Sequence, residues 1–204
     1  MNIRYLLLSI VALSLGIVLI FLPEKKYTRE LTPEKLMLAI NDNSRFMSTD
    51  YVAHMIIESN PSLVLIDVRD STSFSQFSLP GATNIPLDSL LNSEWEGFLD
   101  QDYVKKVFYS NGSVYAAQAW TLTRRLGYEN VYVLKGGINS WVETILRPLE
   151  PASTASSEEF DLYHTRIATS QFFGGGNAAV VSTDSKPAKK IIKKKSKSAL
   201  QGGC

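Results

Sequence analysis

Three short runs of apolar residues stand out along the chain, and each ends in a polar turn. "SLVLID" ends at Asp67, "KVFYS" ends at Ser110, and "NVYVL" is followed by Lys135. Continuous apolar runs of this length are typical of strands buried on both faces, as in parallel sheets. Between the last two runs, apolar positions that share one side predict a helix over residues 115–126. Gly127 is placed to end that helix as its C-cap.

The alternation of strands and helices predicts the fold class. After "NVYVL", the turn "KGG" leads into "INSWVETIL", which reads as a further helix. Strands that alternate with helices form βαβ units, so we expect an α/β domain with a parallel sheet. Sites in such sheets lie beyond the carboxyl ends of the strands. Asp67, Ser110 and Lys135 each follow a predicted strand and are therefore expected at that edge.

Helices are also predicted on both sides of this region. Pro33 suits the first position of a short amphipathic helix, and Ser48 or Thr49 can cap the helix in "STDYVAHMIIES". The linker "PLEPASTASSEE" follows the domain, and "SSEEFDLYHTRIATSQFF" is predicted to form an amphipathic helix with Ser156 or Ser157 as its N-cap. The polar, lysine-rich segment 182–204 is predicted to be disordered.

Residues 5–22, "YLLLSIVALSLGIVLIFL", form an apolar stretch without charge. As a helix this stretch rises ~27 Å, close to the ~30 Å hydrocarbon core of a bilayer. We therefore expect a single-pass membrane anchor, with a cleaved signal peptide as the alternative. Arg4 favours an inside N-terminus, whereas Lys25 and Lys26 favour the opposite orientation. Because long domains cross largely regardless of nearby charge, we expect the domain to be exported, in a periplasmic position.

These features divide the chain into six parts. The predicted parts are an N-terminus at 1–4, the anchor or signal at 5–22, a linker with a short helix at 23–47, the α/β domain at 48–147, a linker with an amphipathic helix at 148–181, and the lysine-rich tail at 182–204. There is no internal repeat. The chemistry is therefore expected in the single domain at 48–147.

Charge is distributed unevenly, although the formal net charge is only +1. Seven of the 21 basic residues are lysines between Lys186 and Lys197, which leaves 14 basic residues against 20 acidic ones elsewhere. A basic tail of this kind is either simply solvated or binds anionic lipid or an acidic protein partner. An envelope scaffold that acts through this tail is one functional alternative. The rest of the pattern resembles no nucleic-acid-binding fold, so no nucleic-acid partner is expected.

The chain has one cysteine, Cys204, and two histidines, His54 and His164, which lie far apart in the sequence. A single cysteine allows no intramolecular disulfide, and the histidines have no metal-ligand spacing. We therefore expect neither a metal site nor a cofactor. Gly202 and Gly203 leave the terminal thiol mobile. Cys204 is then either an exposed thiol without a role or an acceptor or carrier thiol.

The loop "SNGSVY" joins the strand that ends at Ser110 to the following helix. Backbone N–H groups at such a turn, together with the positive end of the helix dipole, suit an anion. The expected binding residues are Asn111, Gly112, Ser113, Val114 and Tyr115. Their ligand would be a small anion or the anionic group of a partner peptide. A βα turn that binds nothing is the alternative.

Several motifs around this loop resemble the rhodanese family, over roughly residues 49–147. "LVLIDVRD", "LPGATNIPL", "VFYSNGSVYAAQAW" and "KGGINSW" follow one another in the order and spacing of that family. The resemblance implies a five-stranded parallel sheet with helices on both faces. It also implies sulfurtransferase chemistry, in which a loop cysteine accepts a sulfane sulfur from a donor such as thiosulfate and passes it to a thiol or cyanide.

The same resemblance places Ser110 at the position of the catalytic cysteine, and it assigns Asp67 and Arg69 to a motif that pairs and pins loops. A serine hydroxyl does not ionise near neutral pH without a general base, and no histidine lies in the loop. It also cannot form a persulfide. We therefore expect a catalytically degenerate domain that acts as a binding or interaction module related to sulfur or redox handling. A sulfur relay that uses Cys204 is the alternative from the enzyme class.

Overall fold

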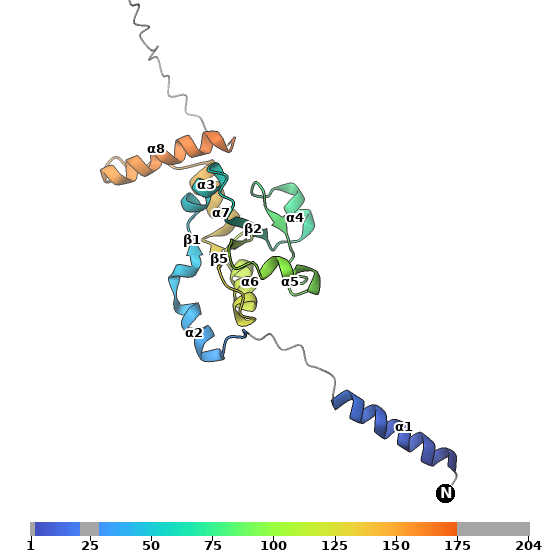
Figure 1. Cartoon of the computed structure of the whole chain (residues 1–204). Coiled ribbons are helices and arrows are strands. Elements are labelled where there is room, and N and C mark those ends of the chain that lie inside the picture. The colour runs from blue at the N-terminus through green and yellow to red at the C-terminus, as the bar shows by residue number, and fades with distance from the viewer. Residues whose placement is uncertain (1–2, 21–28, 175–204) are drawn as a thin grey trace, which may run out of the picture.

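A parallel sheet of five strands, in the order β1-β5-β4-β2-β3, forms the centre of the protein. The computed structural model describes residues 3–20 and 29–174 (Figure 1). The strands are β1 (Phe46–Met47), β2 (Leu63–Asp67), β3 (Thr83–Asn84), β4 (Lys105–Tyr109) and β5 (Val131–Leu134). Every pairing between neighbouring strands is parallel. The predicted α/β fold with a five-stranded parallel sheet is confirmed.

The register of the central strands brings the ends of three predicted strands to one edge. β2 and β4 pair along their whole length, so that Asp67 lies opposite Tyr109. Ser110, the next residue after β4, therefore lies beside the end of β2. β5 pairs with the other side of β4, and Lys135 follows it at the same edge.

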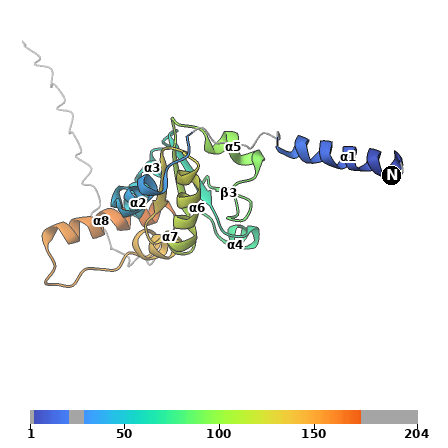
Figure 2. The ribbon, with the colours of Figure 1, turned by 90° about the horizontal axis from the view of Figure 1, so that it is seen from below.

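Helices cover both faces of the sheet (Figures 1 and 2). They are α2 (Pro33–Asn41), α3 (Thr49–Ile57), α4 (Ser71–Gln76), α5 (Ser93–Leu99), α6 (Val114–Arg125), α7 (Gly137–Trp141) and α8 (Ser157–Phe172), with a 3-10 turn at Asn43–Arg45 and a π turn at Val142–Leu146. Two predicted caps are present, because Ser48 accepts from the Tyr51 N–H and Ser156 accepts from the Glu159 N–H. Side-chain capping satisfies backbone donors that the first turn of a helix leaves without a partner.

The two faces of β4 belong to two different cores. Side chains alternate along a strand, so Phe108 enters one core and Tyr109 enters the other. The Phe108 core contains Trp120 of α6, whose indole donates to the Val131 carbonyl at 3.0 Å. The Tyr109 core contains Trp141 of α7 together with residues of α3. Burial on both faces explains why β4 is a continuous apolar run in the sequence.

Helix α8 packs against the outside of the second core. The Arg166 guanidinium binds both carboxylate oxygens of Asp50 on α3, at 2.8 and 2.7 Å. The Ser170 hydroxyl donates to the Leu146 carbonyl at 2.9 Å. Just beyond α8, the ring of Phe173 meets Trp141 edge-on at a centroid distance of 5.2 Å. The predicted C-terminal amphipathic helix is thus part of the folded body rather than a free extension.

The segment before α2 lies against the far end of α6. The Leu31 N–H donates to the Arg125 carbonyl at 3.0 Å, and the Arg125 side chain binds Glu30 at 2.8 Å. Gly127 ends α6 with φ +89°, and a Cβ there would overlap the backbone of Arg29. Glycine is required here both for the left-handed conformation and for the close approach.

The N-terminal helix α1 (Ile3–Ile20) changes one prediction. Within the described ranges 3–20 and 29–174, no helix is long and apolar enough to cross a membrane. The predicted membrane anchor at 5–22, and with it the membrane location and the exported domain, is therefore wrong. Residues 21 and 22 of that range lie outside the described residues.

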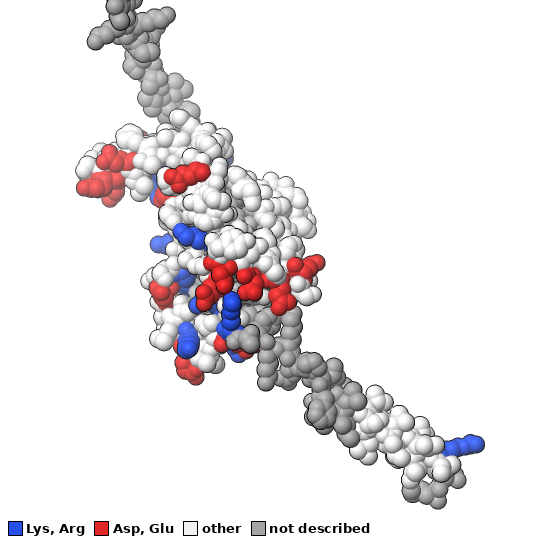
Figure 3. Space-filling model, viewed as in Figure 1, with Lys and Arg blue, Asp and Glu red and all other residues white. Residues whose placement is uncertain are grey.

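Acidic side chains gather across the body on the face shown in Figure 3. This arrangement agrees with the excess of acidic over basic residues outside the lysine-rich segment. The lysine-rich tail at 182–204, including Cys204, lies outside the described residues. The interpretations that rest on this tail and on its thiol therefore stay predictions.

Candidate functional site

The predicted binding loop begins at the end of β4 and closes onto the N-terminus of α6. Ser110, its first residue, is only 2% exposed. The Ser110 hydroxyl donates a hydrogen bond to the Gly112 carbonyl at 2.7 Å. The serine oxygen is therefore buried, and its proton is already held by the loop's own backbone. This geometry shapes the loop and does not present a nucleophile to solvent.

The start of α7 supports the loop from behind. The N–H groups of Ile138 and Asn139 donate to the carbonyls of Ser110 and Asn111, both at 2.9 Å. Gly137 has φ +60°, and a Cβ at this position would overlap the Ser110 carbonyl oxygen. The loop carbonyls thus point towards α7, and this packing needs glycine at position 137.

The backbone N–H groups of the loop find no acceptor among the residues that the structure describes. Within the described part of the chain, none of the N–H groups from Asn111 to Ala116 donates a hydrogen bond to another residue. The first such bond of α6 is that from the Ala117 N–H to the Ser113 carbonyl, at 2.8 Å. Free N–H groups at the N-terminus of a twelve-residue helix form an environment that favours an anion.

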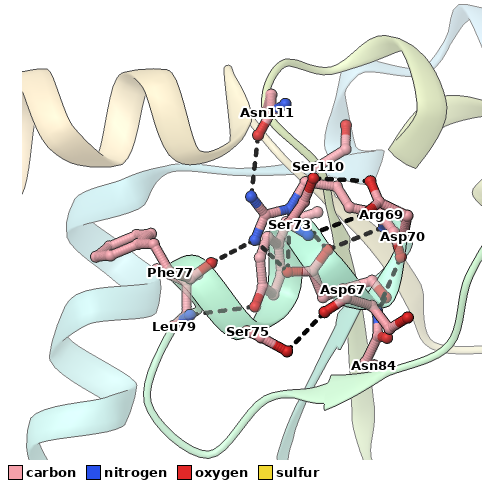
Figure 4. A network of polar contacts seen from close by, with 12 residues as sticks. Asp67, Arg69, Asp70, Ser73, Ser75, Phe77, Leu79, Asn84, Ser110 and Asn111 are labelled. Carbon is pink, nitrogen blue, oxygen red and sulfur yellow. Dashed lines mark hydrogen bonds and ion pairs between the residues drawn. The ribbon is translucent and has the colours of Figure 1, made fainter.

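A buried arginine ties the loop to β2 and α4 (Figure 4). The Arg69 guanidinium binds both oxygens of Asp67, at 3.0 and 2.6 Å, and the Asp67 side chain is fully buried. The same guanidinium donates to the Asn111 side chain at 3.1 Å and to the Phe77 carbonyl at 2.5 Å. Its hydrogen bonds to Asp67 raise the pKa of Arg69, so it is a permanent cation. Asp67 and Arg69 therefore act on the loop through Asn111.

A second buried group fixes the turn that faces the loop. The Leu79 N–H donates to the hydroxyl of Tyr109 at 3.1 Å. Burial raises the pKa of the Tyr109 phenol, which stays neutral at any physiological pH. Tyr109 thus holds the segment after α4 in place and provides no base for Ser110.

A cavity of about 550 Å³ borders the loop on the side of β1 and β5. It is lined by Ser113 of the loop and by Asn43, Phe46, Ser48 and Lys135. No described residue forms an ion pair with the exposed Lys135 ammonium, so its charge is available to a ligand. The sequence placed Lys135 at this edge, but it was not among the expected site residues. Its adjacency to Ser113 comes from the pairing of β5 with β4, which no local motif reveals.

The structure separates the expected site residues into groups. Ser110 is buried, whereas Val114 and Tyr115 expose 69% and 58% of their surface and point away from the core. Asn111 is held by Arg69, and the Ser113 hydroxyl accepts from the Gly136 N–H at 2.9 Å. Cys204 lies outside the described residues, so its relation to the loop stays a prediction.

Comparison with known proteins gives consistent matches over this region. The family model of the Rhodanese-like domain matches residues 48–144. A thiosulfate sulfurtransferase GlpE from Glaesserella parasuis is 36% identical over 94 residues, which cover 45% of this chain and 81% of that protein. A thiosulfate:glutathione sulfurtransferase from Saccharomyces cerevisiae is 26% identical over 110 residues, covering 49% of this chain and 79% of that protein.

Longer relatives are matched over a smaller part of their length. The similar region makes up 22% of a probable adenylyltransferase/sulfurtransferase from Mycobacterium tuberculosis and 28% of a tRNA uridine(34) hydroxylase from Bartonella quintana. Among solved structures, the Alr3790 protein from Anabaena is similar with a TM-score of 0.45 and 24% sequence identity. That match covers 58% of this chain and 93% of the Anabaena chain.

Proposed function

Because the chain belongs to the rhodanese-like domain family, which relates it to sulfurtransferases, we propose that its loop at 110–115 binds an anion without transferring sulfur. The observation that carries the proposal is the row of loop N–H groups without an acceptor in the described ranges 3–20 and 29–174, next to a buried serine. In this proposal the domain is a binding or interaction module. Its ligand is a small oxyanion or the anionic group of a partner peptide.

The chemistry of Ser110 supports the non-catalytic half of the proposal. Sulfur transfer from thiosulfate requires a thiolate that attacks the outer sulfur, forms a persulfide and releases sulfite. A serine hydroxyl near neutral pH needs a general base to attack, and the hydroxyl of Ser110 donates to the Gly112 carbonyl instead. A seryl oxygen cannot store sulfane sulfur as a persulfide. The resemblance assigns Ser110 to the position of the catalytic cysteine. It therefore implies a loop that still binds an anion but no longer transfers sulfur.

The charges around the loop support the anion-binding half. The start of α6 provides N–H donors and the positive end of the helix dipole. Lys135 adds a cation beside Ser113, in the adjoining cavity. Arg69 donates to Asp67, Phe77 and Asn111, so in this proposal it holds the loop in shape and leaves the ligand to the N–H groups and to Lys135.

Two measurements on the full-length chain test this proposal. In the first, ¹⁵N NMR follows a titration with thiosulfate, with chloride at equal ionic strength as the control. We expect the largest amide shifts at residues 111–116.

In the second measurement, thiocyanate formation is followed with thiosulfate and cyanide, and sulfur transfer to glutathione is followed separately. We expect no turnover above background. The absence of loop shifts would contradict anion binding, and turnover that Ser110→Ala abolishes would contradict the loss of transfer.

Substitutions at two positions distinguish the remaining possibilities. Ser110→Cys should gain a persulfide, detected by mass spectrometry as one added sulfur atom after incubation with thiosulfate. Ser110→Ala, which removes the same hydroxyl without adding a thiol, is the matched control. Turnover by the unsubstituted chain that disappears in Cys204→Ser would instead favour a sulfur relay through the C-terminal thiol.

A further inference from the structure

An apolar groove runs along α6. It is distinct from the cavity that Ser113 and Lys135 line. Its volume is about 620 Å³, within the usual range for small-molecule sites, roughly 300–1,000 Å³. Its apolar lining comes from α6, from the end of α2 and from the segment after β3, and includes Ile40, Leu87, Val114, Ala117 and Leu122. Val114 is 69% exposed and Leu122 is 39% exposed. The groove therefore leaves substantial apolar surface open to a ligand.

One charged side chain, that of Arg45, lines this groove. Its guanidinium lies over the ring of Phe46 at 4.7 Å and over the ring of Trp120 at 5.0 Å. No residue in the described ranges accepts a hydrogen bond from it or forms an ion pair with it, and its Nε atom is buried. The aromatic rings partly compensate the charge through cation–π contacts, but they leave the N–H donors without acceptors.

The other arginines that are buried or partly buried show that this arrangement is unusual for the described part of the molecule. Arg69 binds Asp67, Arg166 binds Asp50, and Arg125 binds Glu30. Arg124 donates to the Tyr128 carbonyl at 2.9 Å. Arg45 differs because its cation is held in place by aromatic stacking, while its N–H groups donate to no residue in the described part of the chain. Buried donors of this kind have a desolvation cost that an external acceptor would remove.

We propose that this groove binds an amphipathic organic anion, with its apolar chain against α6 and its carboxylate on Arg45. A guanidinium presents its donors in a planar fork that matches the two oxygens of a carboxylate. The apolar residues of the groove provide the contact area, and Arg45 sets the position of the charged end. This site is separate from the anion site proposed at the loop and does not depend on it, although Val114 borders both.

The test uses the full-length chain and octanoate as the probe. We expect ¹⁵N NMR shifts at residues 114–122 and at the Arg45 side-chain N–H. Octan-1-ol, which has the same chain length without the charge, should bind more weakly. Loss of a charge-assisted hydrogen bond corresponds to about tenfold in affinity or more, so Arg45→Gln should weaken octanoate binding by at least that factor. Arg147→Gln, which removes the charge of an exposed arginine outside the groove, should leave the affinity unchanged.

A second variant keeps the test decisive if Arg45→Gln fails to fold. Ala117→Trp places a large side chain in the groove and leaves Arg45 in position. It should abolish the octanoate shifts, with folding checked by circular dichroism. The proposal would be overturned by equal affinities for octanoate and octan-1-ol, by shifts outside the groove, or by octanoate binding that survives in folded Arg45→Gln or in Ala117→Trp.

Discussion

Arg69 joins three separate parts of the chain through one buried side chain. It binds Asp67 at the end of β2, Asn111 in the loop and the Phe77 carbonyl at the end of α4. A cation in this position would be costly without its carboxylate, and the carboxylate would be costly without the cation. Because each buried charge requires the other as its partner, the pair holds Arg69, and through Asn111 the loop, in one position.

This pairing leads to a prediction for Arg69→Met. The substitution keeps the apolar stem but leaves the Asp67 carboxylate buried without a partner, so we expect a loss of ~3–5 kcal/mol in the free energy of unfolding. Urea unfolding measures the change. Arg166→Met is the matched control, because its bidentate pair with Asp50 is partly exposed and should contribute ~1 kcal/mol or less. Equal losses in the two variants would contradict the role given to the buried pair.

The positions of single residues were predicted well from the sequence where the pairing of the strands determines them. Ser110 and Asp67 follow strands directly, so the parallel register determines where they lie. The groove cation Arg45 was not identified, because its stacking on Trp120 depends on contact between segments 75 residues apart. Lys106 was not identified as buried either. Its ammonium donates to the Gln101 carbonyl at 2.6 Å, and the sequence around a lysine in a strand does not indicate such a contact.

At the level of elements, α7 supports the loop through its glycine-rich start. The carbonyls of Ser110 and Gly112 occupy the space where a side chain at position 137 would begin. The shape of the loop is therefore set by a turn that comes more than twenty residues later in the sequence.

Gly137→Ala tests this contact, and Gly81→Ala is its control. Both glycines have positive φ, +60° and +73°, but nothing lies within 4 Å of a Cβ at Gly81. Gly81→Ala should cost ~1–2 kcal/mol, the conformational penalty alone. Gly137→Ala should cost more and should also reduce thiosulfate binding, because the carbonyls of the loop must move. Urea unfolding and the NMR titration measure the two effects. The idea fails if Gly137→Ala keeps the loop shifts of the unsubstituted chain.

The elements that could be predicted are those with a strong local pattern. The three apolar runs match β2, β4 and β5 within a residue or two, and the helix predicted at 115–126 matches α6 at Val114–Arg125. β1 and β3 were not predicted, because two residues carry no periodicity. α4 and α5 were missed as well. Their sequences, "STSFSQ" and "SEWEGFL", contain serine and glycine, which are weak helix formers, so packing decides their structure.

On the scale of the whole molecule, α8 extends the folded body beyond the region that matches the family model. It begins after residue 144, where that match ends, and binds back to α3 and to the end of the π turn. Trp141 is 1% exposed, and Phe173 supplies one of its ring contacts. Helix α8 is thus packed onto the same folded body as the sheet.

Phe173→Ala should weaken this docking. Losing a partly buried ring is expected to cost ~2 kcal/mol, somewhat less than for a fully buried phenylalanine. The emission of Trp141 should shift to longer wavelength as water gains access. Phe172→Ala is the matched control, because that side chain is 60% exposed and its ring packs against Phe173, whereas the ring contact with Trp141 comes from Phe173 itself. Thermal unfolding followed by tryptophan fluorescence measures both. A Phe173→Ala chain as stable as Phe172→Ala would show that α8 is not held through this contact.

The unpaired amides of the loop also affect how the molecule exchanges hydrogen with water. Strand β4 has both ladder partners, so its amide protons are released only on large-scale opening. Two residues beyond the end of β4, the amide protons from Asn111 to Ala116 have no acceptor in the described chain. The chain therefore passes from strong to weak protection against deuterium exchange within two residues. A bound anion would reverse that contrast by protecting the very amides that exchange fastest in its absence.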